Sequence, residues 1–288
     1  MDGWHRIGPH KTKDYGMNEI IAPWNIKQKQ LANLAYSSGN VDSKEVVLIM
    51  GSCRITNFLN YLVLWNNTIG NNRFKIYCID PFNWNWDIND KWIGCENTIN
   101  AMESNSTLLN ILASVKIFIH EYYKNYGMFN TLKEEGKSIY QFGINPKIDI
   151  QIPNWHNIFI LYKDFISYDP WKKEINSFSG KIPENYLIKI DKQISDNINT
   201  FCSNCNKTSF PEMSLYFINN WKKIRMFWSL NHTSKNFTLP LWNWINEKFL
   251  SLPMTSNYLE EISKIDVLKE KGILYPYDIE RTGIQWKE

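Results

Sequence analysis

Short apolar runs alternate with segments of helical periodicity through the first half of the chain. Val46–Met50 is a continuous apolar run, and the apolar positions of Asn57–Trp65 then recur at helical spacing. A second apolar run, Phe74–Ile79, follows, which is the spacing of a β-α-β unit. A helix over Asn97–Ala113 and a strand over Val115–Ile119 continue the alternation. This pattern predicts parallel strands joined by helical crossovers.

The second half of the chain has the same alternation. Ile158–Tyr162 and Ile224–Trp228 are apolar runs that predict a fourth and a fifth strand. Helical periodicity marks Tyr186–Phe201, Pro211–Lys222 and Leu239–Leu250. We therefore expect an α/β fold, with a mostly parallel sheet and helices on both faces, in a three-layer, flavodoxin-like arrangement.

Three regions are expected along the chain. Residues 1–44 lack a sustained period and predict an irregular N-terminal arm, with one helix at Ile26–Ala35. Residues 45–250 hold the alternating pattern and predict one α/β domain. Residues 251–288 predict a C-terminal extension that packs on the same domain and carries no recognisable chemistry.

Composition and charge exclude several classes of partner. The formal net charge of the 288 residues is +3, and the basic residues are scattered among acids. Nucleic acid is therefore not the expected partner. No apolar run approaches the roughly 20 residues of a membrane span, and no apolar signal core follows the N-terminus. We expect a soluble, cytoplasmic protein.

The five cysteines indicate reduced thiols. An odd number of cysteines without a secretion signal argues against a disulfide framework. Cys202 and Cys205 have the spacing of half a zinc site, but no second such pair and no histidine pair accompany them. We therefore expect no metal.

Polar residues follow the predicted strands at their carboxyl ends, where open α/β sheets bind ligands. These residues are Cys53, Asp80, His120, Glu121 and His232. The topology of the predicted sheet would bring them to one edge. This edge is the candidate site.

Cys53 is the strongest candidate for chemistry. It lies in Gly51-Ser52-Cys53-Arg54, between a predicted strand and the first turn of a predicted helix. Free backbone N–H groups at such a turn can hold an oxyanion and lower the pKa of a thiol. The alternative is a small buried residue that packs under the helix. Arg54 could bind a phosphate or pair with an acid on the surface.

Three further residues are candidates with structural alternatives. His232 follows an apolar run within a polar cluster, where its imidazole could act as a general base oriented by Ser229, or could be a structural histidine. His120 and Glu121 could bind substrate, or could form a solvated strand end.

Four landmarks of the chain, taken in order, resemble those of the WcbI family of polysaccharide-biosynthesis proteins. They are Val47–Arg54, Val115–Tyr122, Ile152–Asn154 and Arg225–Ser234. The family pattern is Gly-Asn-Cys-Gln after the first strand and Asn-His-Pro-Ser or Asn-His-Pro-Thr after the last. The matching positions here are Gly51, Ser52, Cys53 and Arg54, then Asn231, His232, Thr233 and Ser234. Ser52, Arg54 and Thr233 depart from the pattern, which leaves the acceptor and the coenzyme contacts open.

The resemblance implies an acetyl-CoA-dependent acetyltransferase that modifies a hydroxyl or amino group of a sugar in surface polysaccharide or glycan biosynthesis. Cys53 and His232 would be catalytic, and His120 and Glu121 would bind substrate. Coenzyme A would contact four residues, Gly51, Ser52, Arg54 and Asn231. The substrate would be a small-molecule sugar or nucleotide sugar, and a fused or partner glycosyltransferase is left open.

Two alternatives belong to other classes. A more distant likeness to SGNH hydrolases, whose nucleophilic serine occupies the place of Cys53, implies a carbohydrate acetyl esterase. Their final Asp-x-x-His would correspond to Ser229-Leu230-Asn231-His232, and the missing aspartate weighs against efficient hydrolysis. The 13 tryptophans would suit a non-catalytic carbohydrate- or nucleotide-binding module.

Overall fold

The protein is described by a computed structural model that forms two compact units. Unit 1 comprises Met1–Ile152 and Trp242–Val267, and unit 2 comprises Pro153–Leu241 and Leu268–Glu288. Within them the structure describes residues 35–36, 45–51, 55–71, 73–79, 112–121, 144–153, 158–229, 232–266, 269 and 274–286. Asp80 and most of the predicted helices Ile26–Ala35 and Asn97–Ala113 lie outside these residues. The predicted division at residues 44 and 250 stays a prediction.

Unit 1 contains a five-stranded sheet in the order β1-β3-β2-β4-β5. Strands β2 (Glu45–Met50), β3 (Phe74–Ile79), β4 (Val115–Glu121) and β5 (Ile148–Ile152) run parallel to one another. The short β1 (Ala35–Tyr36) pairs antiparallel with β3. The predicted α/β class with a mostly parallel sheet is therefore confirmed.

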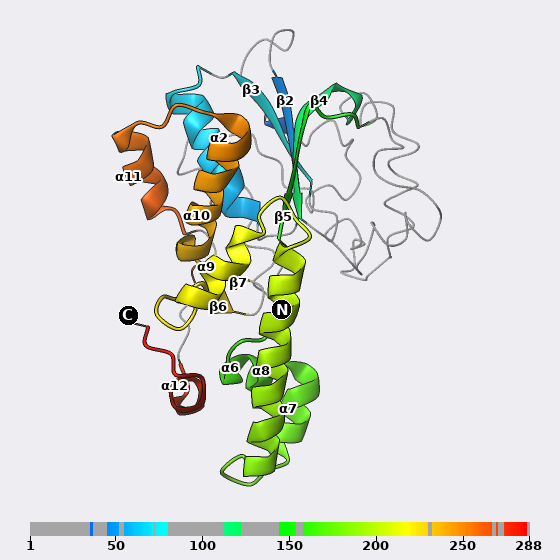
Figure 1. Cartoon of the computed structure of the whole chain (residues 1–288), viewed down its shortest axis with the longest axis vertical. Helices are drawn as coiled ribbons and strands as arrows, with labels where there is room; N and C mark the ends of the chain where they lie inside the picture. The colour runs from blue at the N-terminus through cyan, green and yellow to red at the C-terminus, as the bar shows by residue number, and fades with distance from the viewer. Residues whose placement is uncertain are drawn as a thin grey trace. The chain divides into compact units, whose positions relative to one another are not determined.

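The central strands are buried on both faces. Four consecutive residues of β2, Val47, Leu48, Ile49 and Met50, are at most 1% exposed. Because successive side chains of a strand point to opposite faces, both faces of this strand are covered. The crossover helix α2 (Thr56–Thr68) and helix α11 (Ser256–Lys264) contact each other beside the sheet (Figure 1).

Hydrogen bonds of two polar side chains connect α2 to β3 and to α11. The helix is followed by Gly70, where a Cβ atom would lie 2.3 Å from a ring carbon of Trp65, so only glycine fits the turn. The side-chain amide of Asn66 donates to the backbone carbonyl of Phe74 and accepts from its N–H, at 3.1 and 2.8 Å. On the other side, the hydroxyl of Tyr258 in α11 donates to the carbonyl of Tyr61. These contacts set where β3 begins and where α11 packs.

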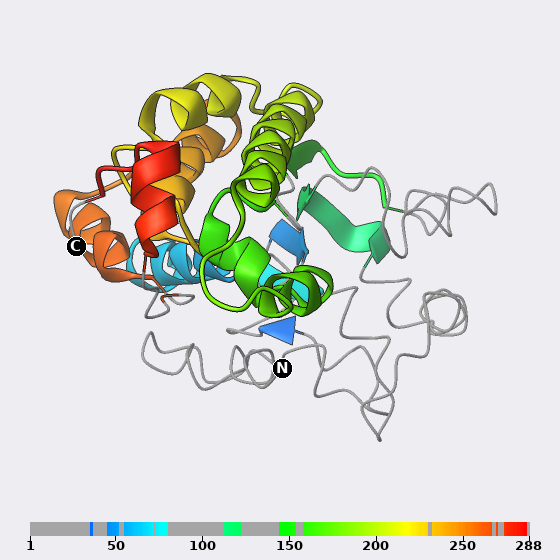
Figure 2. The same ribbon diagram turned by 90° about the horizontal axis from the view of Figure 1, so that it is seen from below.

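Unit 2 is mainly helical. Its elements are α6 (Tyr162–Ser167), α7 (Asp169–Asn176), α8 (Glu184–Cys205), α9 (Glu212–Asn220), β6 (Phe227–Ser229), β7 (His232–Thr233) and α12 (Pro276–Thr282). Helices α8 and α9 pack against each other (Figure 2). The chain passes from unit 2 to unit 1 within α10 (Lys235–Ile245), which the π-helix η9 (Asn246–Leu250) follows. Within the described part of the chain, no helix is long and apolar enough to cross a membrane.

The predicted strand at Ile158–Tyr162 is wrong. Residues 158–161 are buried without strand geometry, and helix α6 begins at Tyr162. The apolar run instead supplies Phe159 and Tyr162 to a cluster that α8 completes with Tyr186, Leu187 and other residues. A short buried run satisfies the same pattern whether it packs as a strand or as coil beneath a helix.

The predicted strand at Ile224–Trp228 is shifted and belongs to another sheet. Strand β6 covers Phe227–Ser229 and pairs antiparallel with β7 in a separate two-stranded sheet of unit 2. The fourth parallel strand is β5 instead, at Ile148–Ile152. Its polar residues Asp149 and Gln151 alternate with isoleucines, of which Ile150 and Ile152 are buried, as on the edge strand of a sheet.

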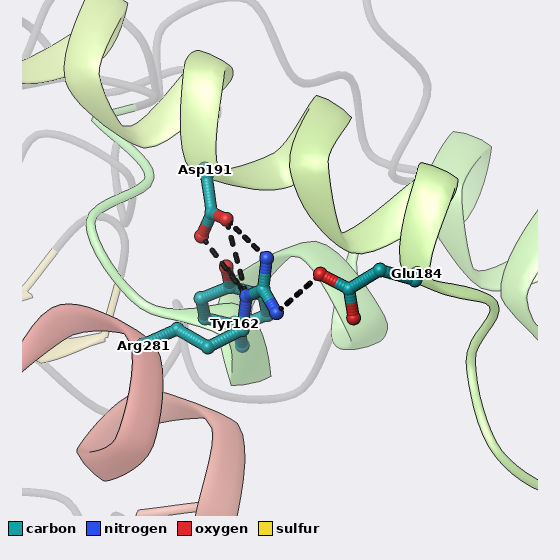
Figure 3. A network of polar contacts seen from close by, with 4 residues as sticks. All are labelled: Tyr162, Glu184, Asp191 and Arg281. Atoms are coloured by element: carbon teal, nitrogen blue, oxygen red, sulfur yellow. Dashed lines mark hydrogen bonds and ion pairs between the residues drawn. The ribbon is translucent and has the colours of Figure 1, made fainter.

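A network of polar contacts attaches α12 to α6 and α8 (Figure 3). The guanidinium of Arg281 donates from Nη2 and Nε to the Asp191 carboxylate, at 2.6 and 3.1 Å to Oδ2, and from Nη1 to Glu184 at 2.8 Å. Its Nε also lies 3.1 Å from the hydroxyl oxygen of Tyr162. Two N–H···O bonds from Nη2 and Nε to one carboxylate suit the planar fork of arginine.

The buried carboxyl of Asp278 joins the starts of two helices. Its Oδ1 accepts from the backbone N–H of Tyr162 at 2.6 Å, at the start of α6. Its Oδ2 accepts from the N–H of Tyr275 at 2.8 Å, just before α12. Burial raises the pKa of Asp278 to about 6, although the backbone N–H groups of Tyr275 and Lys163 and the charge of Lys163 lower it.

Candidate functional site

The topology places a switch point between β2 and β4. From β2 the chain crosses through α2 to β3 on one side, and β4 later pairs with β2 on the other side. Open parallel sheets bind ligands at the carboxyl ends of the strands that flank such a point. Gly51 directly follows β2, and His120 and Glu121 end β4. Met50 and His120 are neighbours in the ladder, so these residues lie at one edge of the sheet.

Glu121 packs against the turn that follows β2. A Cβ atom on Gly51 would lie 3.0 Å from Cγ and Cδ of Glu121 and 2.6 Å from Cγ2 of Ile55. The turn therefore requires glycine, because any side chain would displace one of these neighbours. Glu121 is 0% exposed, and a carboxyl group buried at a ligand-binding edge of a sheet is a candidate for function.

His120 makes a second polar pair on the other face of β4. Its Nε2 lies 3.0 Å from Oδ1 of Asp149 on β5, and its Nδ1 lies 3.3 Å from the backbone carbonyl oxygen of Glu121. The ring also stacks on Phe118, with centroids 4.4 Å apart. A carboxylate that contacts one ring nitrogen fixes the orientation of the imidazole. The His120 ring is thus fixed in its orientation, and the residue is 5% exposed.

The burial of these two residues excludes one alternative. His120 and Glu121 are 5% and 0% exposed, so they do not form a solvated strand end. Because they alternate along β4, their side chains lie on opposite faces of the sheet. Their predicted role in substrate binding stays a prediction.

Four of the predicted site residues lie outside the described residues: Ser52, Cys53, Arg54 and Asn231. Helix α2 begins at Thr56, three residues after Cys53 and one residue before the predicted start at Asn57. Gly51, the first residue of the Gly51-Ser52-Cys53-Arg54 motif, is among the described residues and is buried. The catalytic role of Cys53 and the coenzyme contacts therefore stay predictions.

His232 lies in the two-stranded sheet of unit 2. It begins β7, is partly exposed, and is the ladder partner of Ser229 at the end of β6. The expectation that His232 ends a strand of the parallel sheet is wrong, because β6 is not part of that sheet. The prediction that Ser229 orients the His232 ring is not tested by this backbone pairing.

The two described cysteines lie one turn apart on α8. Cys205 is 0% exposed, and burial raises the pKa of its thiol; burial also raises the pKa of the partly buried Cys202. Metal ions bind the thiolate rather than the thiol, which this environment disfavours. Among the residues that the structure describes, no group of three or more histidines, cysteines or acids is arranged to hold a metal ion.

Asp149 belongs to the candidate site but was not among the residues predicted for it. It neighbours Phe118 in the ladder and reaches diagonally to His120, two positions further along β4. The alternation of Ile148-Asp149-Ile150-Gln151-Ile152 is the signal that could have revealed this strand. An acid near a strand end would then have become a candidate partner for a histidine on the next strand.

Comparisons with known proteins give one structural likeness. No family model matches the chain, and no curated protein matches it. A solved structure of WcbI is similar, with 13% sequence identity, a TM-score of 0.46, and coverage of 85% of this chain and 81% of that chain. That protein is described as a novel polysaccharide biosynthesis enzyme, in its native form without a disulfide bond between coenzyme A and one of its cysteines.

Proposed function

We propose that this protein is an acetyltransferase that moves the acetyl group of acetyl-CoA to a hydroxyl or amino group of a sugar, in the biosynthesis of a polysaccharide or glycan. The observation that carries the proposal is the glycine turn at the β2–β4 switch point, with the buried Glu121 packed against Gly51. The motif that begins at this glycine, Gly51-Ser52-Cys53-Arg54, is the first landmark of the sequence resemblance.

Cys53 is close to this edge of the sheet by covalent connection alone. Only Ser52 separates Cys53 from Gly51 in the chain, so their Cα atoms lie at most about 7 Å apart. In this proposal the backbone N–H groups of Ser52–Arg54 hold the oxyanion that develops when the thioester is attacked.

Two routes would transfer the acetyl group. In the covalent route the Cys53 thiolate attacks the carbonyl carbon of acetyl-CoA, and the coenzyme thiolate leaves and takes a proton. The acceptor hydroxyl or amine then attacks acetyl-Cys53 and gives its proton to His232, while the Cys53 thiolate leaves. In the direct route His232 deprotonates the acceptor, which attacks the carbonyl carbon of acetyl-CoA. The coenzyme thiolate leaves and takes a proton, and Cys53 only lines the site.

Incubation with acetyl-CoA labelled in the acetyl group tests the proposal. The covalent route predicts one acetyl group per chain, on Cys53, detected by mass spectrometry of the intact protein and its peptides. The variant Cys53→Ala would lose this label. For either route, coenzyme A at 100 times its dissociation constant stabilises the protein by about 2.7 kcal/mol, which a thermal-shift titration detects. No shift with coenzyme A or acetyl-CoA would contradict the proposal.

The esterase alternative differs in its need for the coenzyme. An esterase would release acetate from a small acetate ester in the absence of coenzyme A, whereas the proposed transferase would not. Measuring acetate release with and without coenzyme A therefore separates the two functions.

A further inference from the structure

Three cationic side chains of unit 2 gather around one tryptophan. Cζ of Arg225 lies 5.1 Å from the ring centroid of Trp228, and Nζ of Lys269 lies 5.7 Å from it. Nζ of Lys163 donates to the backbone carbonyl of Trp228 at 2.9 Å. The three cations come from segments far apart in sequence, so the fold brings their charges together here. Trp228 is partly exposed.

A second tryptophan extends this surface. Cζ of Arg225 lies 5.1 Å from the ring centroid of Trp286 as well, and Trp286 is also partly exposed. The indole N–H of Trp286 donates to the carbonyl of Trp221 at 2.6 Å, which holds the C-terminal segment in place. An arginine that stacks on rings uses its π faces, and its N–H groups lie in the guanidinium plane. We call Lys163, Arg225, Trp228, Lys269 and Trp286 the Trp228 cluster.

The surrounding sequence adds positive charge. Residues 213–246 contain Lys222, Lys223, Arg225 and Lys235, and no aspartate or glutamate. The carboxyl group of Asp278 interacts electrostatically with Lys163, a member of the cluster. Like charges held together raise the free energy of the protein, and a bound anion relieves this repulsion.

We infer that the Trp228 cluster binds a nucleotide. Lysine and arginine side chains pair with phosphate oxygens, and an indole offers a flat surface on which a nucleobase stacks. The choice of a nucleotide rests on the proposed function, because acetyl-CoA and a nucleotide sugar both carry one. The cluster adjoins His232, the predicted general base, because Ser229, the next residue after Trp228, is the ladder partner of His232.

Calorimetric titration of the full-length protein tests the inference without any acetyl transfer. The probes are adenosine 3′,5′-bisphosphate, uridine diphosphate, inorganic pyrophosphate and adenosine. We expect at least one nucleotide to bind, with an affinity that falls as salt is added, and pyrophosphate and adenosine to bind at least about tenfold more weakly. Tighter binding of the adenosine bisphosphate would assign the cluster to the coenzyme, and tighter binding of uridine diphosphate to the acceptor.

Substitutions locate the binding. Arg225→Gln is expected to weaken nucleotide binding by about tenfold, because one charge-assisted contact is lost. Lys269→Gln is expected to weaken it by a few fold. The matched control is Lys189→Gln on α8, whose Nζ lies 5.6 Å from the ring centroid of Tyr186. It removes the same charge and the same type of contact outside the cluster, and is expected to change nothing.

Three results would overturn the inference: no binding of either nucleotide, binding of pyrophosphate as tight as that of the nucleotides, or equal effects of Lys269→Gln and Lys189→Gln. Lys269 is exposed, so its variant decides the question even where Arg225→Gln fails to fold. An absence of nucleotide binding together with acetylation of Cys53 would overturn this inference and leave the proposed function standing.

Discussion

The carboxyl carbon of Glu121 lies 3.0 Å from the position that a Cβ atom on Gly51 would occupy. Glu121 ends β4 and Gly51 follows β2, so this close approach joins two neighbouring strands at the edge where the topology switches. It also explains why the motif that leads to Cys53 begins with a glycine.

The first prediction concerns this glycine. Gly51→Ala places a methyl group 2.6 Å from Cγ2 of Ile55 and 3.0 Å from Glu121, so one of them must move. We expect the free energy of unfolding to fall by about 1–3 kcal/mol, the usual cost of overpacking. Urea denaturation followed by circular dichroism measures this loss.

A second substitution checks the cause of that loss. Ile55→Ala removes the nearest atom, so the double variant Gly51→Ala/Ile55→Ala is expected to be more stable than the sum of the two single losses implies. Strict additivity would mean that the methyl group does not meet Ile55.

The second prediction concerns the pair between His120 and Asp149. Asp149→Ala leaves the Nε2 atom of a 5% exposed imidazole without its carboxylate partner. We expect a loss of about 1–3 kcal/mol in the free energy of unfolding, because a buried polar group loses a hydrogen bond. Chemical denaturation at neutral pH measures it.

Glu45→Ala is the matched control for Asp149→Ala. It breaks an ion pair on the same sheet, between Glu45 and Arg73 at 3.2 Å, in which both side chains are about half exposed. Exposed ion pairs contribute about 0–1 kcal/mol, so the control is expected to lose less. Equal losses would show that His120 does not depend on Asp149.

The third prediction concerns the attachment of α12. Arg281→Lys keeps the positive charge but cannot reproduce the two N–H···O bonds to Asp191 while also reaching Glu184 and Tyr162 (Figure 3). We expect the free energy of unfolding to fall by about 1–2 kcal/mol. Thermal denaturation, analysed at a common temperature, measures the change.

Glu184→Gln distinguishes the contributions to stability of the two carboxylates that Arg281 contacts. Glu184 is 67% exposed and Asp191 is 38% exposed, so solvent screens the pair with Glu184 more strongly. We expect Glu184→Gln to cost less than about 0.5 kcal/mol. A larger cost than that of Arg281→Lys would contradict this account of the network.

The fourth prediction concerns pH. The pKa of Asp278 is raised by burial from 3.8 to about 6, so between these values the carboxyl is protonated in the folded chain and ionised in the unfolded chain. Its contribution to stability is therefore fully present below pH 4 and is lost as the pH rises to about 6, by up to about 3 kcal/mol. Asp278→Asn removes this dependence.

Urea denaturation of both proteins from pH 4 to pH 7 tests this sign. As the pH rises, the unfolding free energy of the natural protein is expected to fall relative to that of Asp278→Asn. Asp169→Asn, on the exposed start of α7, is the control and is expected to leave the pH profile unchanged. If the natural protein instead became more stable relative to Asp278→Asn, the hydrogen bonds from Tyr162 and Tyr275 would outweigh burial.

The fifth prediction concerns the proposed catalytic pair. His232→Ala is expected to lower kcat for acetyl transfer by about 100-fold or more on either route, because the general base is lost. Cys53→Ala abolishes the covalent route and leaves much of the direct one. On the covalent route the double variant is expected to be little worse than Cys53→Ala alone, since residues that act as a unit are not additive. Fully multiplicative losses in kcat would contradict a shared step.

The sequence predicts the sheet of unit 1 well where apolar runs are long. Strand β3 was predicted at its observed bounds, Phe74–Ile79, and β2 and β4 within two residues. These strands are buried on both faces, so their residues are apolar at nearly every position. Glu121, the last residue of β4, is polar although it is buried.

The errors arise where periodicity does not distinguish one environment from another. The run Ile158–Tyr162 is apolar because it supplies the core of unit 2, and the run Ile224–Trp228 because it precedes a short antiparallel ladder. Neither sequence reveals which strand it would pair with. The β5 strand has the opposite problem, since Asp149 and Gln151 make it look like a loop. The contact between His120 and Asp149 was missed together with this strand.

The environment of the α8 cysteines makes covalent labelling informative. Cys205 is inaccessible, and the pKa values of both Cys202 and Cys205 are raised, so both react slowly with iodoacetamide in the native protein at neutral pH. Rapid alkylation would therefore report on the remaining thiols, which include Cys53. Protection of such a thiol by coenzyme A would give a footprint of the ligand without any substitution.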